Sequence, residues 1–533
     1  MDVRFPFASQ RMPVLACRGA VATSQPLAAQ AGLRMLLAGG NAVDAALAAA
    51  AALVVLEPTS CGLGGDLFAM VWDGQRLHGL NASGPCPSGL SAELLRRRGL
   101  QEVPLFGWES VTVPGVVAGW VALARRFGSM PLAEVMRPAV EYAEQGFPVG
   151  PRTAALWQQA QQTLGRFEGF RSTYLPGGEA PRAGQLVRLV DHGRSLRLIA
   201  ESWGEAFYRG ELAEALVAYS DRTGGYLTRE DLAGYQPEWV EPLGVRYRDV
   251  EIWELPPNGQ GVAVLATLGI LHHFDLSGAA LDPSRVHLLV EAVRLGLDEA
   301  YRYVADPRTA PVPVARFTDP GVARELAGRI SPQRAMPDPI PDRRWVGGTV
   351  YLCAADGQGR MVSLIQSNFH GFGSGVVVPG TGIALQNRGA CFNLIEGHPN
   401  EMRPGRRPFH TIIPGFMTRG GQALADFGVM GGDMQAQGHV QVVSHMVDAG
   451  LNPQAALDVP RFRVLPGGKV AVEPEFPSDV VAALTRLGHR VQVGNAGMGV
   501  GGFGGGQVIW REPDSGVYVA GSDPRKDGQA VGY

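Results

Sequence analysis

The chain has 533 residues, of which 45% are hydrophobic and 18% are charged, and its formal net charge is −3. This length allows two to four domains or one large unit with a sizeable core, and the composition excludes an intrinsically disordered protein. The small negative charge gives no reason to expect a nucleic acid or another polyanion as a partner.

The N-terminal residues, the apolar runs and the cysteines indicate the cellular compartment in which we expect the protein. The first residues lack the basic start and apolar core of a signal peptide, and the longest apolar run, residues 45–56, is too short to span a bilayer. We therefore expect a cytoplasmic protein with no membrane association. Five cysteines stand at spacings that match neither a zinc site nor a disulfide framework, and they are Cys17, Cys61, Cys86, Cys353 and Cys391.

The first predicted element is an alanine-rich helix. Asn41 or Asp44 can cap it, and because it is apolar on every side it should be buried. It ends at Glu57-Pro58 and is followed by a glycine-rich loop, residues 59–65, and a strand over residues 66–72. The loop lacks the lysine of a P-loop, and no helix follows it directly. We interpret it as a tight turn that lets backbones pack closely.

The rest of the N-terminal part is mainly helical in pattern. Residues 111–120 predict a strand, a turn and the start of a helix, and residues 131–232 are mostly helical. A turn at residues 256–261 precedes another helix, and residues 286–304 have good helical periodicity. After Thr349 the pattern changes to short strands with glycine turns. Helices before this residue and strands after it predict an α+β fold with a layered core.

Thr349 follows two glycines and opens a predicted strand that ends in a turn at residues 356–359. If the bond between Gly348 and Thr349 were cut, Thr349 would carry a hydroxyl nucleophile and a free α-amine. An α-amine has a reference pKa of about 7.7–8.0, so near neutral pH it can act as general base for the hydroxyl. Gly348 has no Cβ and would let the hydroxyl approach the scissile carbonyl. A Gly-Gly-Thr sequence before a strand is usually only a turn, so the rest of the chain must decide.

Seven short motifs follow one another along nearly the whole chain. They are Gly39-Gly40-Asn41-Ala42-Val43-Asp44-Ala45, Glu57-Pro58 with Gly62-Leu63-Gly64-Gly65, Val113-Pro114-Gly115, Pro256-Pro257, Tyr301 through Asp306-Pro307, Gly347-Gly348-Thr349, and Gly521-Ser522-Asp523-Pro524-Arg525. Each motif is weak alone. In this order and at these spacings they resemble the γ-glutamyltranspeptidases, or glutathione hydrolases, and in particular a bacterial, lid-less, cephalosporin-acylase-like branch.

The resemblance implies an N-terminal-nucleophile hydrolase with a four-layer αββα sandwich, formed as a single intertwined unit by a self-cleaving proenzyme. Cleavage would give a large subunit, residues 1–348, and a small subunit, residues 349–533, which stay associated. The resemblance also implies a small-molecule amide as substrate, and no metal or organic cofactor. It leaves open whether a homo-oligomer forms.

The same resemblance assigns the catalytic residues. Thr349 falls on the nucleophile, and Ser367 takes the place of a second threonine that steadies the amine of the nucleophile; serine keeps the hydroxyl that this requires. Gly431 and Gly432 match paired glycines whose backbone amides hold the oxyanion. The Thr349 amine would take the hydroxyl proton, the oxygen would attack an amide carbonyl, and the acyl group would pass to water or an amine.

The half of the site that would bind a glutamyl group departs from the family pattern. The arginine that clamps the α-carboxylate and the acid that pairs with the α-ammonium are both missing, and Arg388 introduces a cation instead. The positions concerned are Ser83 or a neighbour in place of the arginine, Phe369 in place of an asparagine, Arg388 and Cys391 in place of a glutamine and an aspartate, and His410 and Thr411 in place of two serines.

These departures shape the expected substrate. We expect a γ-glutamyl or glutaryl-type amide, with Arg388 available to a terminal carboxylate of the acyl chain. The glycine-rich lid usual in the family is absent between Phe392 and Pro408, so we expect hydrolysis more than transfer to an acceptor. Two alternatives remain: a cephalosporin-acylase-like amidase, and an unprocessed relative that serves as a binding or assembly protein.

Overall fold

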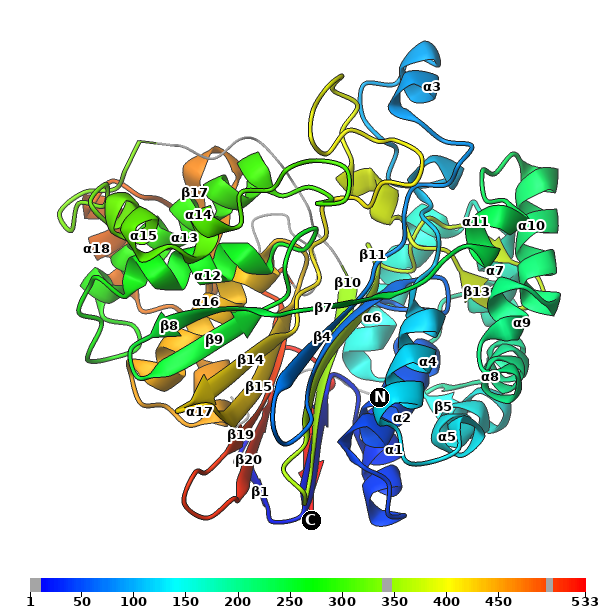
Figure 1. The fold of residues 1–533 in the computed structure, drawn as a ribbon, viewed down its shortest axis with the longest axis horizontal. Helices are drawn as coiled ribbons and strands as arrows, with labels where there is room; N and C mark the ends of the chain where they lie inside the picture. The colour runs from blue at the N-terminus through cyan, green and yellow to red at the C-terminus, as the bar shows by residue number, and fades with distance from the viewer. Residues whose placement is uncertain (1–10, 338–347, 495–501) are drawn as a thin grey trace.

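Two seven-stranded antiparallel sheets pack face to face in the computed structural model, and helices cover the outer face of each (Figure 1). The structure describes residues 11–337, 348–494 and 502–533. Buried side chains such as Phe68 and Tyr351 fill the space between the sheets. The order of layers is therefore helices, sheet, sheet, helices, in agreement with the predicted α+β sandwich.

Antiparallel pairing fixes the order of strands in both large sheets. The first sheet consists of β1 (Val14–Ala16), β20 (Tyr518–Ser522), β19 (Gly505–Arg511), β15 (Gln422–Met430), β14 (Gly415–Arg419), β9 (Val250–Glu254) and β8 (Leu243–Tyr247). The second consists of β21 (Gln529–Gly532), β2 (Gly19–Thr23), β10 (Gly348–Asp356), β11 (Met361–Phe369), β3 (Asp66–Trp72), β4 (Leu77–Ala82) and β7 (Glu238–Val240).

Both sheets combine strands from before and after Thr349. In the second sheet, β10 lies between β2 and β11, and Leu352 pairs with Thr23 on one side and Leu364 on the other. In the first sheet, β14 pairs with β9 from the N-terminal part. The prediction of helices before Thr349 and strands after it was therefore wrong in this simple form. Strands from each part pair with strands from the other part in both sheets. In addition, a 14-residue helix, α16 (Met434–Val447), follows Thr349.

The predicted alanine-rich helix is α2 (Ala42–Leu56), and every residue in it is buried. The Asn41 side chain accepts the backbone N–H of Asp44, and the Asp44 carboxylate accepts the backbone N–H of Asn41. This reciprocal capping box satisfies two donors at the start of the helix, and it confirms both predicted caps. Small alanine side chains allow α2 to lie close against β10 and β11.

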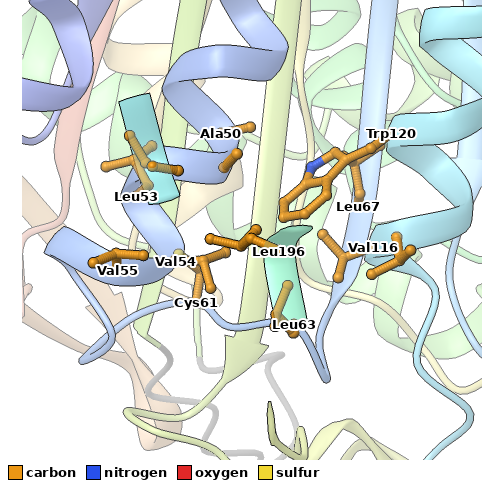
Figure 2. Close-up of a cluster of buried hydrophobic side chains, with 14 of the residues drawn as sticks. Ala50, Leu53, Val54, Val55, Cys61, Leu63, Leu67, Val116, Trp120 and Leu196 are labelled. Carbon is orange, nitrogen blue, oxygen red and sulfur yellow. The ribbon is translucent and has the colours of Figure 1, made fainter. Parts of the chain in front are cut away.

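Trp120, on α4 (Val116–Phe127), ties this helical layer to β11. Its ring belongs to the buried cluster in Figure 2, together with Ala50 of α2 and Leu67 of β3. The indole N–H donates to Gln366 Oε1 (3.0 Å), and Gln366 Nε2 donates to the carbonyl oxygen of Ala50 (2.9 Å). Gln366 directly precedes Ser367, so the helices fix the strand beside the candidate site.

The other helices complete the two outer layers (Figure 1). The helical pattern over residues 131–232 is confirmed. With the second sheet lie α1 (Pro26–Leu37), α5 (Leu132–Gln145), α6 (Pro151–Leu164), α7 (Glu168–Tyr174), α8 (Val190–Ser202), α9 (Glu205–Tyr208), α10 (Glu211–Thr223) and α11 (Arg229–Ala233). With the first sheet lie α12 (Gly261–Leu271), α13 (Pro283–Tyr303), α14 (Ala315–Thr318), α15 (Pro320–Ala327), α17 (Pro453–Asp458) and α18 (Ser478–Arg486).

Smaller elements complete the chain. A three-stranded sheet, β16 (Phe462–Leu465), β17 (Lys469–Val472) and β18 (Arg490–Val493), lies near α18. Helix α3 (Ala92–Arg97) and two-stranded pairs, β5 (Phe147–Pro148) with β6 (Leu186–Val187) and β12 (Val377–Val378) with β13 (Ile383–Ala384), lie in loops.

The strand predicted within residues 111–120 does not form, although α4 begins as expected. The Val113 N–H donates to the carbonyl oxygen of Pro85 (3.0 Å), which is a single contact and not a ladder. Pro114 follows and has no N–H, so the pairing cannot continue. The segment is therefore extended without being part of a sheet.

Two further features complete the description. All five cysteines are free. In the described part of the chain, no helix has the length and apolar character needed to cross a membrane. The first residues, on which the expectation about a signal peptide depends, lie outside the described ranges.

Candidate active site

Thr349 is the second residue of β10, where the pairing of β10 with β11 becomes irregular. Gly348 pairs with Phe369 and Val350 pairs with Gln366, so the register shifts beside Thr349. Such bulges re-aim a side chain out of the regular alternation of a strand and are frequent next to active sites. The Thr349 residue is 2% exposed.

The hydroxyl of Thr349 belongs to a short run of hydrogen bonds. It donates to Ser367 Oγ (3.3 Å), and the Ser367 hydroxyl donates to the carbonyl oxygen of Gly348 (2.7 Å). Ser367 Oγ also accepts the backbone N–H of Phe369 (2.7 Å), so its single hydrogen remains for Gly348. Gln435, in the first turn of α16, donates from Nε2 to Thr349 Oγ1 (3.3 Å). The predicted nucleophile, its predicted neighbour and the carbonyl group before the predicted cut are thus connected by hydrogen bonds.

Gly431 and Gly432 form the turn between β15 and α16, with φ values of +128° and +68°. Among the described residues, no acceptor takes the backbone N–H of either glycine. Both N–H groups precede the N-terminus of α16, where the dipole of a helix favours negative charge. Because Gly431 lines the same pocket as Thr349, this turn can receive the oxyanion of an acyl-transfer step.

The pocket beside Thr349 has a volume of about 150 Å³, and none of the described side chains that line it is acidic. Trp345, Val346 and Gly347, which precede the predicted cut, lie outside the described residues. Burial lowers the pKa of His370, which keeps this imidazole neutral near neutral pH. Besides Thr349 and Gly431, the wall includes Thr59, Phe106, His370 and Lys526.

The glycine-rich loop before β3 packs against the strand that carries Ser367. A methyl group on Gly65 would lie 2.5 Å from the carbonyl oxygen of Ser367, and one on Gly64 would lie 2.4 Å from that of Ala384. Real side chains do not tolerate such distances. The interpretation of this loop as a tight turn for close backbone packing is therefore confirmed.

Arg388 lies in a second, buried cluster. Its Nη1 donates to Thr411 Oγ1 (2.7 Å), and its guanidinium lies over the ring of Phe369, 4.5 Å from the ring centroid. Its Nε and Nη2 have no acceptor among the described residues. Burial lowers the pKa of Arg388, although the neighbouring Cys391 thiol and Asp66 carboxyl act in the opposite direction. Phe369 connects the two clusters, since its N–H contacts Ser367 and its ring contacts Arg388.

His410 belongs to this second cluster through Asp66. Its Nε2 lies 2.9 Å from Asp66 Oδ2, and both side chains are fully buried. Burial lowers the pKa of His410 well below its usual range, and the positive charges of Arg388 and Arg407 lower it further. Burial raises the pKa of Asp66 to about 7, against the lowering effect of Arg388.

Ser83, the position predicted in place of the clamping arginine, is also buried but contacts other groups. Its hydroxyl donates to Asn81 Oδ1 (2.7 Å), and Asn258 Nδ2 donates to its oxygen (3.3 Å). No hydrogen bond among the described residues joins the Ser83 side chain to Arg388, although its partner Asn258 accepts the backbone N–H of His410 (2.9 Å). Of the five predicted substrate-binding residues, none is among the described residues that line the Thr349 pocket, and they are Ser83, Phe369, Arg388, His410 and Thr411.

Two residues at the site were not found from the sequence. Gln435 contacts Thr349, while Lys526 lines the pocket. Lys526 directly follows the last of the recognised motifs, so its position along the chain was the available signal. Neither residue type pointed to a role by itself.

Comparison with known proteins gives a consistent result. A sequence model of the γ-glutamyltranspeptidase family matches residues 28–533. The glutathione hydrolase-like YwrD proenzyme of Bacillus subtilis is 33% identical over 533 residues, which cover 97% of this chain and 99% of that protein. The oxamate amidohydrolase proenzyme of Klebsiella pneumoniae is 34% identical over 528 residues, covering 95% and 97%. The crystal structure of a cephalosporin acylase from Bacillus halodurans superposes with a TM-score of 0.95 at 48% identity, covering 100% and 99%.

Proposed function

This chain belongs to the γ-glutamyltranspeptidase family, and we propose that it is a proenzyme that cuts itself between Gly348 and Thr349 and then hydrolyses small amides. The observation that carries this proposal is the run of hydrogen bonds from Thr349 through Ser367 to the Gly348 carbonyl. A hydrogen bond to a carbonyl oxygen stabilises the negative charge that develops there during attack. Here the attacking hydroxyl and the polarised carbonyl belong to adjacent residues.

In the proposed cutting step, Thr349 Oγ1 bonds to the carbonyl carbon of Gly348, and the hydroxyl proton passes to the nitrogen of Thr349. The C–N bond between the two residues breaks and an ester remains. Water hydrolyses this ester, which leaves a carboxylate on Gly348 and restores the hydroxyl of Thr349. Ser367 holds the carbonyl oxygen while charge develops on it. The products are residues 1–348 and 349–533.

After the cut, the new α-amine of Thr349 acts as the general base. It takes the hydroxyl proton as the oxygen attacks the substrate amide, and the backbone N–H groups of Gly431 and Gly432 hold the oxyanion. The protonated amine then gives its proton to the departing amine, and water hydrolyses the acyl-enzyme. Ser367, released from Gly348, becomes available to the α-amine.

The two products remain together in this proposal because both sheets are built from both subunits. Strand β10 of the small subunit lies between β2 of the large subunit and β11 of the small one. In the first sheet, β14 and β20 of the small subunit pair with β9 and β1 of the large one. Separation would break backbone ladders in both sheets and expose the core between them.

For the acyl group we propose a chain that ends in a carboxylate, as glutaryl does. Arg388 has two buried nitrogens, Nε and Nη2, without an acceptor among the described residues, and a carboxylate can accept from such a pair in bidentate fashion. By the family resemblance, Cys391 replaces the acid that would pair with an α-ammonium. A γ-glutamyl group would therefore bury its ammonium beside a cation and without a partner, which is unfavourable.

The names of the relatives do not choose between these acyl groups, since they include a glutathione hydrolase-like protein, an oxamate amidohydrolase and a cephalosporin acylase. The choice therefore depends on Arg388 and its surroundings. The absence of the lid segment from the sequence favours water over a larger acceptor amine.

Denaturing electrophoresis and a pair of chromogenic amides test this proposal together. The purified protein should run as two fragments, and kcat/KM should be higher for glutaryl-4-nitroanilide than for γ-glutamyl-4-nitroanilide. A single intact and inactive band would point to an unprocessed binding or assembly protein. Two fragments with a preference for the γ-glutamyl compound would contradict the assignment of Arg388 while leaving the self-cleavage intact.

A further inference from the structure

The side chain of Gln435 holds the nucleophile from the first turn of α16. It is fully buried, its Nε2 donates to Thr349 Oγ1 (3.3 Å), and its Oε1 accepts the backbone N–H of Ile413 (3.1 Å). The Ile413 N–H can only donate, so the end of the amide that faces it must be the oxygen. The end that faces Thr349 is then the NH2 group. Gln435 is therefore the donor in its contact with the nucleophile.

This contact fixes the direction in which the Thr349 hydroxyl can point its own hydrogen. A hydroxyl has one hydrogen and accepts through its lone pairs. Thr349 Oγ1 accepts from Gln435 and donates to Ser367 Oγ (3.3 Å). Among the described residues, no second side chain donates to this oxygen. Gln435 therefore approaches the oxygen from a direction that leaves the hydrogen free for transfer to a base.

Backbone contacts hold Gln435 in place relative to the oxyanion turn. Its N–H donates to the carbonyl oxygen of Gly432 (3.2 Å). Gln260, which is also fully buried, donates from Nε2 to the same carbonyl oxygen (2.9 Å) and to that of Thr411 (2.6 Å). Thr411 lies two residues before Ile413, so one segment supports both glutamines. The donor is thus preorganised, and it needs no rearrangement to meet charge on the nucleophile oxygen.

We propose that Gln435 is a further catalytic residue, which promotes the departure of Thr349 Oγ1 when water hydrolyses the acyl-enzyme. This inference rests on the proposed amide hydrolysis. Water bonds to the acyl carbon and gives one proton to the α-amine of Thr349, while the carbonyl oxygen takes the negative charge. The carbonyl then re-forms, the bond from the acyl carbon to Oγ1 breaks with its electron pair going to Oγ1, and the amine returns the proton to this oxygen. The Gln435 N–H stabilises the charge on Oγ1 as the bond breaks.

The two halves of the reaction use this contact differently. When the acyl group moves to the enzyme, the departing group is the amine, and departure of Oγ1 would only return the substrate. In the hydrolysis, Oγ1 must depart in preference to the water oxygen that has just arrived. A contact accelerates only a step in whose transition state it is strengthened. Gln435 therefore serves the second half, whereas Gly431 and Gly432 hold the carbonyl oxygen in both.

The 4-nitroanilide and the 4-nitrophenyl ester of glutaric acid form the same acyl-enzyme, so together they separate the two halves. The ester acylates faster, and its kcat reports hydrolysis of the acyl-enzyme once its spontaneous hydrolysis is subtracted. In Gln435→Met, kcat for the ester should fall about 10–100-fold, the usual effect of losing a hydrogen bond to a charged group. The change in kcat/KM should be smaller. An initial burst of nitrophenol should appear, and mass spectrometry should find a glutaryl group on the fragment 349–533.

Gln441→Met is the matched control. Gln441 is buried on the same helix, and its Oε1 accepts the backbone N–H of Phe462 at the same distance of 3.1 Å, but its Nε2 donates only to backbone carbonyls. This variant should show neither the burst nor the fall in kcat. Wild-type kinetics in Gln435→Met, or equal losses in kcat and kcat/KM without a burst, would overturn the proposed role.

The second step of the self-cleavage also releases Oγ1 from an ester, so Gln435→Met should cut more slowly. If this variant folds but stays in one piece, hydroxylamine should split it between Gly348 and Thr349, because the ester has formed; a folded chain that resists hydroxylamine would contradict the proposal. If the variant does not fold, Gln435→Glu decides, since its ionised carboxylate still accepts from Ile413 and has no donor for Thr349. A wild-type protein that stays uncut and hydrolyses neither compound would refute the proposed function itself.

Discussion

The hydroxyl of Ser367 donates a hydrogen bond of 2.7 Å to the carbonyl oxygen of Gly348. The Ser367 hydroxyl therefore donates to the carbonyl oxygen of the peptide bond that we propose is cut, and negative charge develops on this oxygen during the attack. This contact also gives Ser367 two successive roles, first toward the Gly348 carbonyl and then toward the amine that the cut releases. The two roles can be separated by experiment, because one concerns fragment formation and the other concerns turnover.

Ser367→Ala should slow self-cleavage by about 10²–10³-fold, the usual effect of removing one oxyanion donor. The rate of fragment appearance on denaturing gels measures this directly. Ser363→Ala is the matched control, because Ser363 lies on the same strand and its hydroxyl is hydrogen-bonded to Tyr351 (2.8 Å), away from the cut. Equal rates in the Ser367 variant and the wild type would refute the proposed role of Ser367.

Gly431→Ala should allow the cut but reduce hydrolysis by at least about 10²-fold. The φ of +128° disfavours an L-residue, and a methyl group would lie 3.1 Å from Gly504 Cα, so the oxyanion donors must move. The cut is less affected because Ser367 holds the Gly348 carbonyl. Gly420→Ala controls for backbone strain alone, since its φ is +57° and a methyl group there meets nothing within 4 Å. Similar activity in the two variants would exclude the Gly431 N–H as an oxyanion donor.

Arg388→Met should lose activity on glutaryl amides without losing stability. Arg388 is a buried cation with one hydrogen bond among the described residues, and burying a charge without a paired partner is unfavourable, so an apolar side chain there should not destabilise the unliganded protein. Asp66 need not remain as an uncompensated charge, because burial raises its pKa to about 7 and it can take a proton.

Thermal unfolding and kcat/KM for glutaryl-4-nitroanilide measure the two effects. Arg461→Met provides the contrast, since Arg461 is equally buried but is paired with Asp523 (2.6 Å); removing it should destabilise the protein by about 3–5 kcal/mol. A large fall in the melting temperature of Arg388→Met would show that Arg388 serves the fold and not a ligand.

The cut protein should elute as one species in gel filtration under native conditions, although it gives two bands under denaturing conditions. The reason is that β10 is hydrogen-bonded to strands of both subunits. Recovery of the two fragments as separate native species would contradict the mixed sheets.

The local features of the fold were accessible from the sequence, and the contacts between distant segments were not. The capping of α2 by Asn41 and Asp44 and the strand predicted from Thr349, which begins at Gly348, depend on residues within a few positions of each other. The failed strand at residues 111–113 had the right residue types, but Pro114 and the lack of a neighbouring edge prevented pairing.

The site divides in the same way. Thr349 and Ser367 lie on adjacent antiparallel strands, so a hairpin brings them together. Gln435 and Lys526 reach the site from α16 and from the turn before β21, and no local pattern predicts which side chains a pocket gathers from remote elements. Arg388 was identified as a cation near the site, but its complete burial outside the pocket lining depends on Phe369 and Thr411 closing over it.

Mass spectrometry of the intact chains in the active fraction tests the central claim most directly. We predict two polypeptides, the smaller beginning at Thr349 with an unblocked α-amine, and we predict that Thr349→Ala stays as one inactive chain. Active material in which the bond between Gly348 and Thr349 is still present would contradict the account, because the amine proposed as general base would not exist.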